Sequence, residues 1–173
     1  MTTSLTVDKT ARFARFVDAH RERAIRTAWR LCGGNATAAE EVAQEAFVRA
    51  WHGLHGFREE AELSTWFYRI LVREAGRYRR WRAVRERWAA VTGRPEPTRE
   101  VYGDPGLRKR IGAAVESLSP NQREVFVLVH LEGFTVKETA EITGRAPGTV
   151  KSHLHRALVG LRAALADLKK EAT

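Results

Sequence analysis

The sequence predicts an all-α fold in which two small helical domains are joined by a flexible linker. Apolar residues recur at helical spacing along most of the 173 residues, and no stretch shows the alternating pattern of a strand. Residues 92–106 contain three of the five prolines and three glycines, a composition typical of a linker with little regular structure. We therefore expect one domain over 11–90, a linker over 91–106 and a second domain over 107–170.

Three helices are expected in the first domain, over 11–32, from Thr37 to about Trp51, and from Ser64 to about Trp88, separated by Gly33-Gly34-Asn35 and by a loop over about 52–63. The first ten residues are expected to form a loose tail. Thr37 and Glu40 have the spacing of a capping box, and Ser64 is expected to be the N-cap of the third helix.

The second domain is expected to begin with two helices, over 107–117 and 120–132. Ser119 and Gln122 have the capping-box spacing at the start of the second of these. Pro120 suits its first turn, where a missing N–H is no loss, and Gly133 suits its end.

The most informative stretch is TVKETAEITGRAPGTVKSHLHR, residues 135–156, which has the pattern of a helix-turn-helix. Thr135 and Glu138 have the capping-box spacing that begins a helix. Gly144 suits a left-handed helix exit, and Pro147 suits the first turn of the helix that follows.

The helix after Pro147 is predicted to have two different faces. One is an apolar stripe of Val150, Leu154, Ala157, Leu158, Leu161 and Leu165. The other carries donors for base edges and phosphates, namely Thr149, Lys151, Ser152, His155 and Arg156. This pattern predicts a DNA-reading helix, and a helical hairpin with a solvated polar face is the alternative.

Composition narrows the class of protein. The net charge is +9 and the pI is near 10.4, which favours a polyanionic partner such as nucleic acid. No apolar run approaches the roughly 20 residues of a membrane span, and the N-terminus has no signal-peptide core. The single cysteine, Cys32, excludes an intramolecular disulfide and is expected to be a small buried residue. A cytoplasmic protein is expected, with no cofactor and no metal.

The predicted third helix carries a second candidate site. Residues 69–87 contain eight arginines and only two acids, Glu74 and Glu86. Four arginines lie near one face with aromatic residues between and around them: Arg69, Arg73, Arg77 and Arg80, with Trp66, Phe67, Tyr68, Tyr78 and Trp81. Arginines for phosphates and rings for base stacking favour single-stranded or opened nucleic acid. The alternatives are a solvated basic face and, for Phe67, Ile70 and Leu71, a place in the core, which we favour for those three.

An acidic face is predicted on the second helix. Glu40, Glu41, Gln44 and Glu45 lie along one side of it. In a chain this basic, such a face suits a protein partner better than DNA. A solvated surface that interacts favourably with the helix dipole is an equal alternative.

These features resemble the sigma-70 family of bacterial RNA polymerase specificity subunits, in particular its extracytoplasmic-function (ECF) group. AEEVAQEAFVRAW, residues 39–51, resembles region 2.2, which binds the polymerase core. STWFYRILVREAGRYRRWR, residues 64–82, resembles regions 2.3 and 2.4, which melt and read the −10 element. The segment 118–158, from LSPNQREV to GTVKSHLHRAL, is similar to region 4, which reads the −35 element. The resemblance covers roughly 11–168.

The resemblance implies a role for each matching residue. Polymerase core would be contacted by Glu41, Gln44 and Glu45; the melted −10 strand by Trp66, Tyr68, Arg69, Arg73, Arg77 and Arg80; and the −35 duplex by Thr149, Lys151, Ser152, His155 and Arg156. The loop over about 57–64 would capture a flipped base. The implied partners are core polymerase, through its clamp and flap regions, promoter DNA and an anti-sigma factor, with no membrane insertion.

Two positions depart from the family pattern. Arg73 stands where an asparagine is frequent, which puts the −10 preference in question, and Ala38 stands where an aspartate is common. Two other classes of function compete with a sigma factor. An ordinary helix-turn-helix regulator would bind duplex DNA tightly without polymerase. A nucleic-acid enzyme is disfavoured because no zinc-protease, phosphate-loop or paired-cysteine motif is present.

Overall fold

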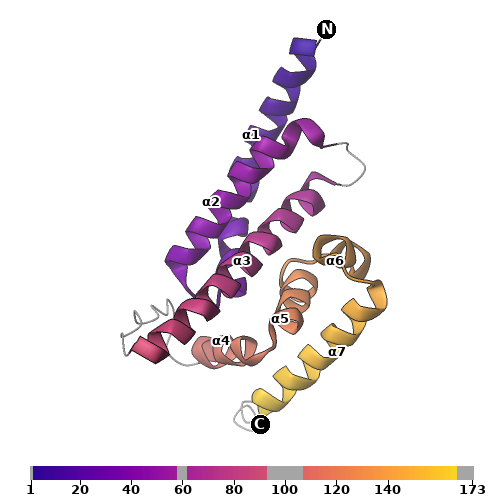
Figure 1. Ribbon diagram of the computed structural model, residues 1–173. Coiled ribbons are helices and arrows are strands. Elements are labelled where there is room, and N and C mark those ends of the chain that lie inside the picture. Colours follow the sequence, from indigo (N-terminus) through magenta and orange to yellow (C-terminus); the bar gives the residue numbers. More distant parts are fainter. Residues whose placement is uncertain (1, 58–61, 93–106, 167–173) are drawn as a thin grey trace. The chain divides into compact units, whose positions relative to one another are not determined.

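The computed structural model describes residues 2–57, 62–92 and 107–166, and these residues form helices and turns with no strand (Figure 1). They divide into two compact units. The N-terminal unit holds α1 (Thr2–Leu31), α2 (Ala36–Gly53), the short η1 (Leu54–Gly56) and α3 (Leu63–Thr92). The C-terminal unit holds α4 (Leu107–Ser117), α5 (Pro120–Phe126), η2 (Val127–Leu131), α6 (Val136–Thr143) and α7 (Pro147–Ala164). The all-α fold class is confirmed.

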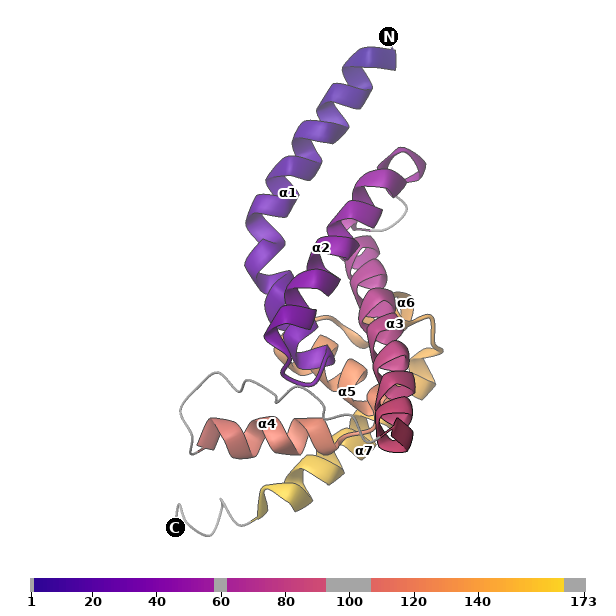
Figure 2. The ribbon, with the colours of Figure 1, turned by 60° about the vertical axis from the view of Figure 1, so that its left-hand side comes forward.

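The N-terminal unit is a three-helix bundle in which α2 runs antiparallel to both α1 and α3 (Figures 1 and 2). Alanines on the buried face of α2, among them Ala39, Ala43 and Ala46, allow close helix approach. The aromatic part of the core centres on Phe67 of α3, whose ring centroid lies 4.4 Å from that of Phe47 and 5.3 Å from that of Phe16. Cys32 is buried, as the sequence predicts.

Several helix ends in this unit differ from the sequence prediction. Helix α1 begins at Thr2, so the expected tail is wrong; the segment has no glycine or proline that would stop a helix. Helix α2 begins at Ala36, so Thr37 lies inside the helix and is not its N-cap. The residue before the helix is Asn35, a type favoured at N-caps. Helix α3 begins at Leu63, so Ser64 is not its cap; the Trp66 N–H donates to the Glu62 carbonyl at 3.0 Å.

The sequence predicted the end of the first helix correctly, whereas the third helix runs past its predicted end into the expected linker. Gly33 and Gly34 have φ of 70° and 79°, and the left-handed backbone at these residues ends α1 as predicted. Residues 91 and 92, expected in the linker, are the last two residues of α3. The remaining linker positions, 93–106, lie outside the described residues, as do 58–61 of the expected loop.

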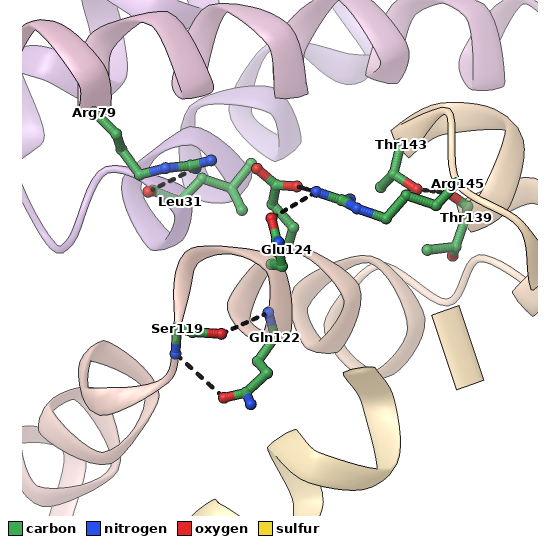
Figure 3. A network of polar contacts seen from close by, with 9 residues as sticks. Leu31, Arg79, Ser119, Gln122, Glu124, Thr139, Thr143 and Arg145 are labelled. Carbon is green, nitrogen blue, oxygen red and sulfur yellow. Dashed lines mark hydrogen bonds and ion pairs between the residues drawn. The ribbon is translucent and has the colours of Figure 1, made fainter. Parts of the chain in front are cut away.

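The C-terminal unit follows the predicted helix boundaries closely. The Ser119 N–H donates to Gln122 Oε1 at 3.2 Å and the Gln122 N–H donates to Ser119 Oγ at 3.4 Å, which completes the capping box (Figure 3). The expected helix over 120–132 changes character near its end, because η2 is a π-helical turn in which the Glu132 N–H donates to the Val127 carbonyl. Gly133, at φ 75°, then ends it.

An arginine side chain closes the end of α4. The Arg123 guanidinium donates to the carbonyl of Val115 at 3.1 Å, to that of Leu118 at 3.4 Å, and also to that of Glu116. The last carbonyls of a helix have no partner within it, so α5 supplies one to α4. These hydrogen bonds hold the end of α4 against α5.

The helix-turn-helix is formed by α6 and α7. Thr135 and Glu138 make the predicted capping box, with the Glu138 N–H donating to Thr135 Oγ1 at 3.2 Å. Hydrogen bonds from the Thr135 hydroxyl and N–H lower the pKa of the Glu138 carboxyl. The contribution of this cap to stability is therefore present above the ordinary carboxyl range and is lost as the pH falls through the lowered pKa.

Two apolar clusters hold the C-terminal unit together. Val125, Ala140 and Val150 join α5, α6 and α7, with Val129, Val136 and Leu154 packed around them. Ala114, Leu118, Ala157 and Leu161 join α4 to α7, with Val115, Phe126 and Leu165 at the edge. The predicted apolar stripe of α7 therefore divides between the two clusters.

Two glycines of this unit predict opposite effects of alanine. Gly144 has φ 68°, where a side chain is strained, whereas Gly112 lies within α4 with no atom near its missing Cβ. We expect Gly144→Ala to lower the free energy of unfolding by about 1–2 kcal/mol and Gly112→Ala to raise it by about 0.5–1 kcal/mol. Urea denaturation followed by circular dichroism checks this, and a stabilising Gly144→Ala would contradict it.

Candidate nucleic-acid and partner-binding surfaces

The outer face of α7 is the first candidate surface. Val150, Ala157 and Leu161 are buried, and Leu154, Leu158 and Leu165 are half-buried. The predicted DNA-facing residues are all exposed: Thr149, Lys151, Ser152, His155 and Arg156. Ser152 Oγ donates to the Gly148 carbonyl at 3.0 Å, which holds the hydroxyl close to the first turn of α7. The arrangement presents two cations and three hydrogen-bonding groups along one helix face.

An ion pair that the sequence analysis missed fixes the turn before α7. Arg145 Nη2 lies 2.9 Å from Glu124 Oε2 and donates to Asn121 Oδ1 at 2.7 Å (Figure 3). The Glu124 side chain is 6% exposed. A buried charge persists only where it is paired, so this contact ties the turn to α5. A glutamate within the otherwise apolar EVFVLV run, Glu124–Val129, was the available signal.

The arginine row of α3 is the second candidate surface. Arg73, Arg77 and Arg80 are exposed and Arg69 is half-buried. Towards the C-terminal half of α3, the Arg85 guanidinium carbon lies 4.7 Å from the centroid of the Trp81 ring, which is 52% exposed. An exposed ring among exposed arginines is suited to base stacking and phosphate contact.

The aromatic residues predicted beside this row divide into two groups. Trp66 is half-buried and packs on Phe57 with ring centroids 5.0 Å apart, next to the loop whose residues 58–61 lie outside the described ones. Phe67 and Leu71 are buried, as favoured, and Ile70 is half-buried.

Tyr68 lies in the core rather than on the predicted surface. It is fully buried, its ring packs edge-on against Phe67, and the Arg23 guanidinium lies over it at 5.5 Å. Three consecutive aromatic residues on a helix cannot all face outward, and the 3.6-residue period turns Tyr68 inward. A base cannot stack on it in this structure, so we leave it out of the candidate surface.

The acidic face of α2 is the third candidate surface. Glu40, Glu41, Gln44 and Glu45 are exposed, whereas Ala38 is buried. A shallow groove of about 370 Å³ runs between α2 and α3, lined by Glu41, Val42, Glu45, Glu74, Arg77, Tyr78 and Trp81. Burial raises the pKa of the Tyr78 hydroxyl in this groove. The groove therefore lies between the acidic face and the arginine row.

A chain of ion pairs crosses from α2 to α3 beside this groove. Arg49 Nε lies 2.7 Å from Glu45 Oε1 and 3.0 Å from Glu74 Oε1. Arg77 Nη1 lies 3.1 Å from Glu74 Oε2. The sequence shows Glu74 as one of two acids among eight arginines over residues 69–87, and this isolation was the available signal that it has a cationic partner.

Together these surfaces define a helical nucleic-acid-binding protein. It has a helix-turn-helix in one unit and, in the other, a basic aromatic helix beside an acidic face. Among the described residues, no helix is long and apolar enough to cross a membrane.

Comparison with known proteins places this arrangement in a family. Residues 16–85 match the model of sigma-70 region 2 and residues 108–161 match that of sigma-70 region 4. The chain is 30% identical to the ECF RNA polymerase sigma factor SigW of Bacillus subtilis, over 90% of each protein. It is 32% identical to SigE of Mycolicibacterium smegmatis, over 88% of this chain and 61% of that protein.

A solved structure agrees with these matches. The sigma factor RpoE of Bartonella quintana, in complex with the anti-sigma factor NepR, has a TM-score of 0.68 and 26% identity, over 89% of this chain and 96% of that one. The chain therefore belongs to the ECF group of the sigma-70 family of RNA polymerase sigma factors.

Two arginines of the helix-turn-helix should respond differently to alanine. We expect Arg145→Ala to lower the free energy of unfolding by about 3 kcal/mol, since it breaks a pair with a buried carboxylate. Exposed Arg156→Ala should change stability by less than about 0.5 kcal/mol.

All five tryptophans precede residue 89, so tryptophan fluorescence reports only the N-terminal unit. Circular dichroism and hydrogen exchange also report the C-terminal unit, and they measure this difference in stability. Equal stability of the two variants would contradict the role of Arg145 as a brace.

Proposed function

We propose that this chain directs core RNA polymerase to promoters by binding two promoter elements at once, with no catalysis of its own. The supporting observation is the presence in one chain of a region 4 helix-turn-helix and a region 2 helix with its arginine row exposed. An ordinary regulator that has only a helix-turn-helix would have no use for the exposed arginine row.

The −35 element is assigned to α7. Its exposed face carries Thr149, Lys151, Ser152, His155 and Arg156 on a helix braced by Arg145. A helix of this kind enters the major groove, where hydrogen-bond donors distinguish base pairs and cations contact phosphates.

The −10 element is assigned to α3 and the loop before it. Arg69, Arg73, Arg77 and Arg80 would hold the opened strand, and Trp66 would lie near its bases. Unstacking a base costs a few kcal/mol, so strand opening requires capture of the unpaired bases. Arg73 adds a cation where the family often has an asparagine, and we propose that it shifts the −10 preference of this chain.

The acidic face is assigned to polymerase. Glu41, Gln44 and Glu45 are exposed on α2 and would face a basic surface of the core enzyme. Attachment to the core would fix the spacing of the two DNA-binding units, so that modest affinities combine through effective concentration. A protein with this role works in the cytoplasm, where RNA polymerase acts.

An anti-sigma factor is the further proposed partner. The related RpoE structure contains the anti-sigma factor NepR. We extend that relationship to this chain as a proposal.

The central experiment is a core polymerase pull-down followed by run-off transcription on a pool of random promoters. We expect stable association and transcription from a restricted set of sequences. Tight operator binding by the chain alone, without association to core, would instead favour an ordinary helix-turn-helix regulator.

Reversing one charge on the acidic face tests its assignment. We expect Glu45→Arg to reduce core association by at least tenfold, since the variant would present a cation to a basic surface. The matched control is Glu22→Arg, an exposed glutamate of α1 that also precedes an arginine by four residues. Equal binding by the two variants would remove the acidic face from the polymerase contact.

The assignment of α7 is tested at Arg156. We expect Arg156→Ala to cost about 1–3 kcal/mol at the upstream element and to relax the preference at one base pair, as for an arginine that reads a base. Binding titrations on single-substitution promoter variants measure this. A uniform loss on every sequence would make Arg156 a phosphate contact.

A further inference from the structure

One buried carboxylate lies between two of the proposed surfaces. The Glu74 side chain is 7% exposed and lies within 3.0 Å of Arg49 from α2 and 3.1 Å of Arg77 from α3. Each carboxylate oxygen faces one arginine, Oε1 towards Arg49 and Oε2 towards Arg77. A carboxylate this buried needs at least one close cation at all times, but it does not need two.

Arg49 is divided between two carboxylates. Its Nε lies 2.7 Å from Glu45 Oε1, on the acidic face, and 3.0 Å from Glu74 Oε1. The four charges therefore form one unbroken series, Glu45, Arg49, Glu74 and Arg77. Glu74 is the buried member of the series, whereas Glu45, Arg49 and Arg77 are 47%, 43% and 56% exposed.

We propose that Glu74 is a positioning residue that couples the acidic face to Arg77. In the free chain Arg49 is shared, so Glu74 retains Arg77. When a basic partner group engages Glu45, Arg49 donates wholly to Glu74, and Arg77 is released to a DNA phosphate. The roles of the two surfaces rest on the proposed function; the coupling between Glu45 and Arg77 does not.

The direction of this change follows from the sharing of Arg49 between Glu45 and Glu74. Once Glu45 no longer competes for Arg49, that arginine alone supplies the close cation that the buried Glu74 carboxylate needs. Arg77 can then leave Glu74, because more than half of its side chain is already in solvent. Coupling between two binding sites is reciprocal, so a phosphate on Arg77 would also strengthen partner binding at Glu45.

The coupling is tested in the free chain with oligo(dT) as the phosphate probe. Glu45→Gln should imitate the engaged state, because Glu74 is then the one charged acceptor that Arg49 keeps among the described residues. We expect affinity for oligo(dT) to rise about two- to fivefold, the range of an exposed ion pair. The slope of log affinity against log salt should steepen by about 0.7, the value of one added phosphate contact on a single strand.

Glu22→Gln is the matched control. Glu22 is exposed and pairs with Arg26 four residues on, as Glu45 does with Arg49, and its removal changes net charge equally. If Glu22→Gln raised the affinity for oligo(dT) as much as Glu45→Gln does, net charge alone would explain the effect and the proposal would be overturned.

A double variant isolates Arg77 as the residue released. In an Arg77→Ala background, Glu45→Gln should have no more effect than the control, whereas a purely electrostatic effect would persist and overturn the coupling. Both side chains are half-exposed, so these variants keep the fold even if Glu74→Gln does not.

These measurements need neither polymerase nor promoter. A chain that fails to associate with core would refute the proposed function and leave the coupling intact. Unchanged oligo(dT) binding in Glu45→Gln would refute the coupling and leave the proposed function intact.

Discussion

Pairing between a buried glutamate and arginine organises both units of this protein. A chain with 30 lysines and arginines and 21 acids must keep its cations available to DNA and yet hold some of them in place. Glu74 does so on α3 and Glu124 does so before α7. In each case the carboxylate is almost wholly buried, so the pair is strong enough to position an arginine that a surface pair would leave mobile.

The same chemistry closes helix ends. Arg123 satisfies the last carbonyls of α4, and Arg79 Nη1 lies 3.4 Å from the Leu31 carbonyl at the end of α1 (Figure 3). Arginine thus has a structural use here in addition to its use on DNA. The five donors of a guanidinium suit this, because one side chain can serve several carbonyls at once. A count of arginines therefore overstates the cations that face DNA.

The sequence predicted the C-terminal unit better than the N-terminal one, for local reasons. Ser119, Thr135, Gly133 and Gly144 determine helix ends through short-range contacts, and all four behave as predicted. In the N-terminal unit, Thr37 and Ser64 have suitable side chains but lie inside helices that begin earlier. The sequence did not predict the burial of Tyr68 and Glu74, because it depends on which face of α3 packs against the other helices. Periodicity alone does not give the partners of a buried charge.

Neighbouring positions on α3 carry different constraints. Arg73 is exposed, whereas Glu74, the next residue, is buried and paired across two helices. Under the proposed function, a change at position 73 would alter the −10 contact and leave the bundle untouched, while a change at 74 would disturb the bundle first. Promoter preference could then change through position 73, while helix packing holds position 74 fixed. Two adjacent codons would then evolve at very different rates.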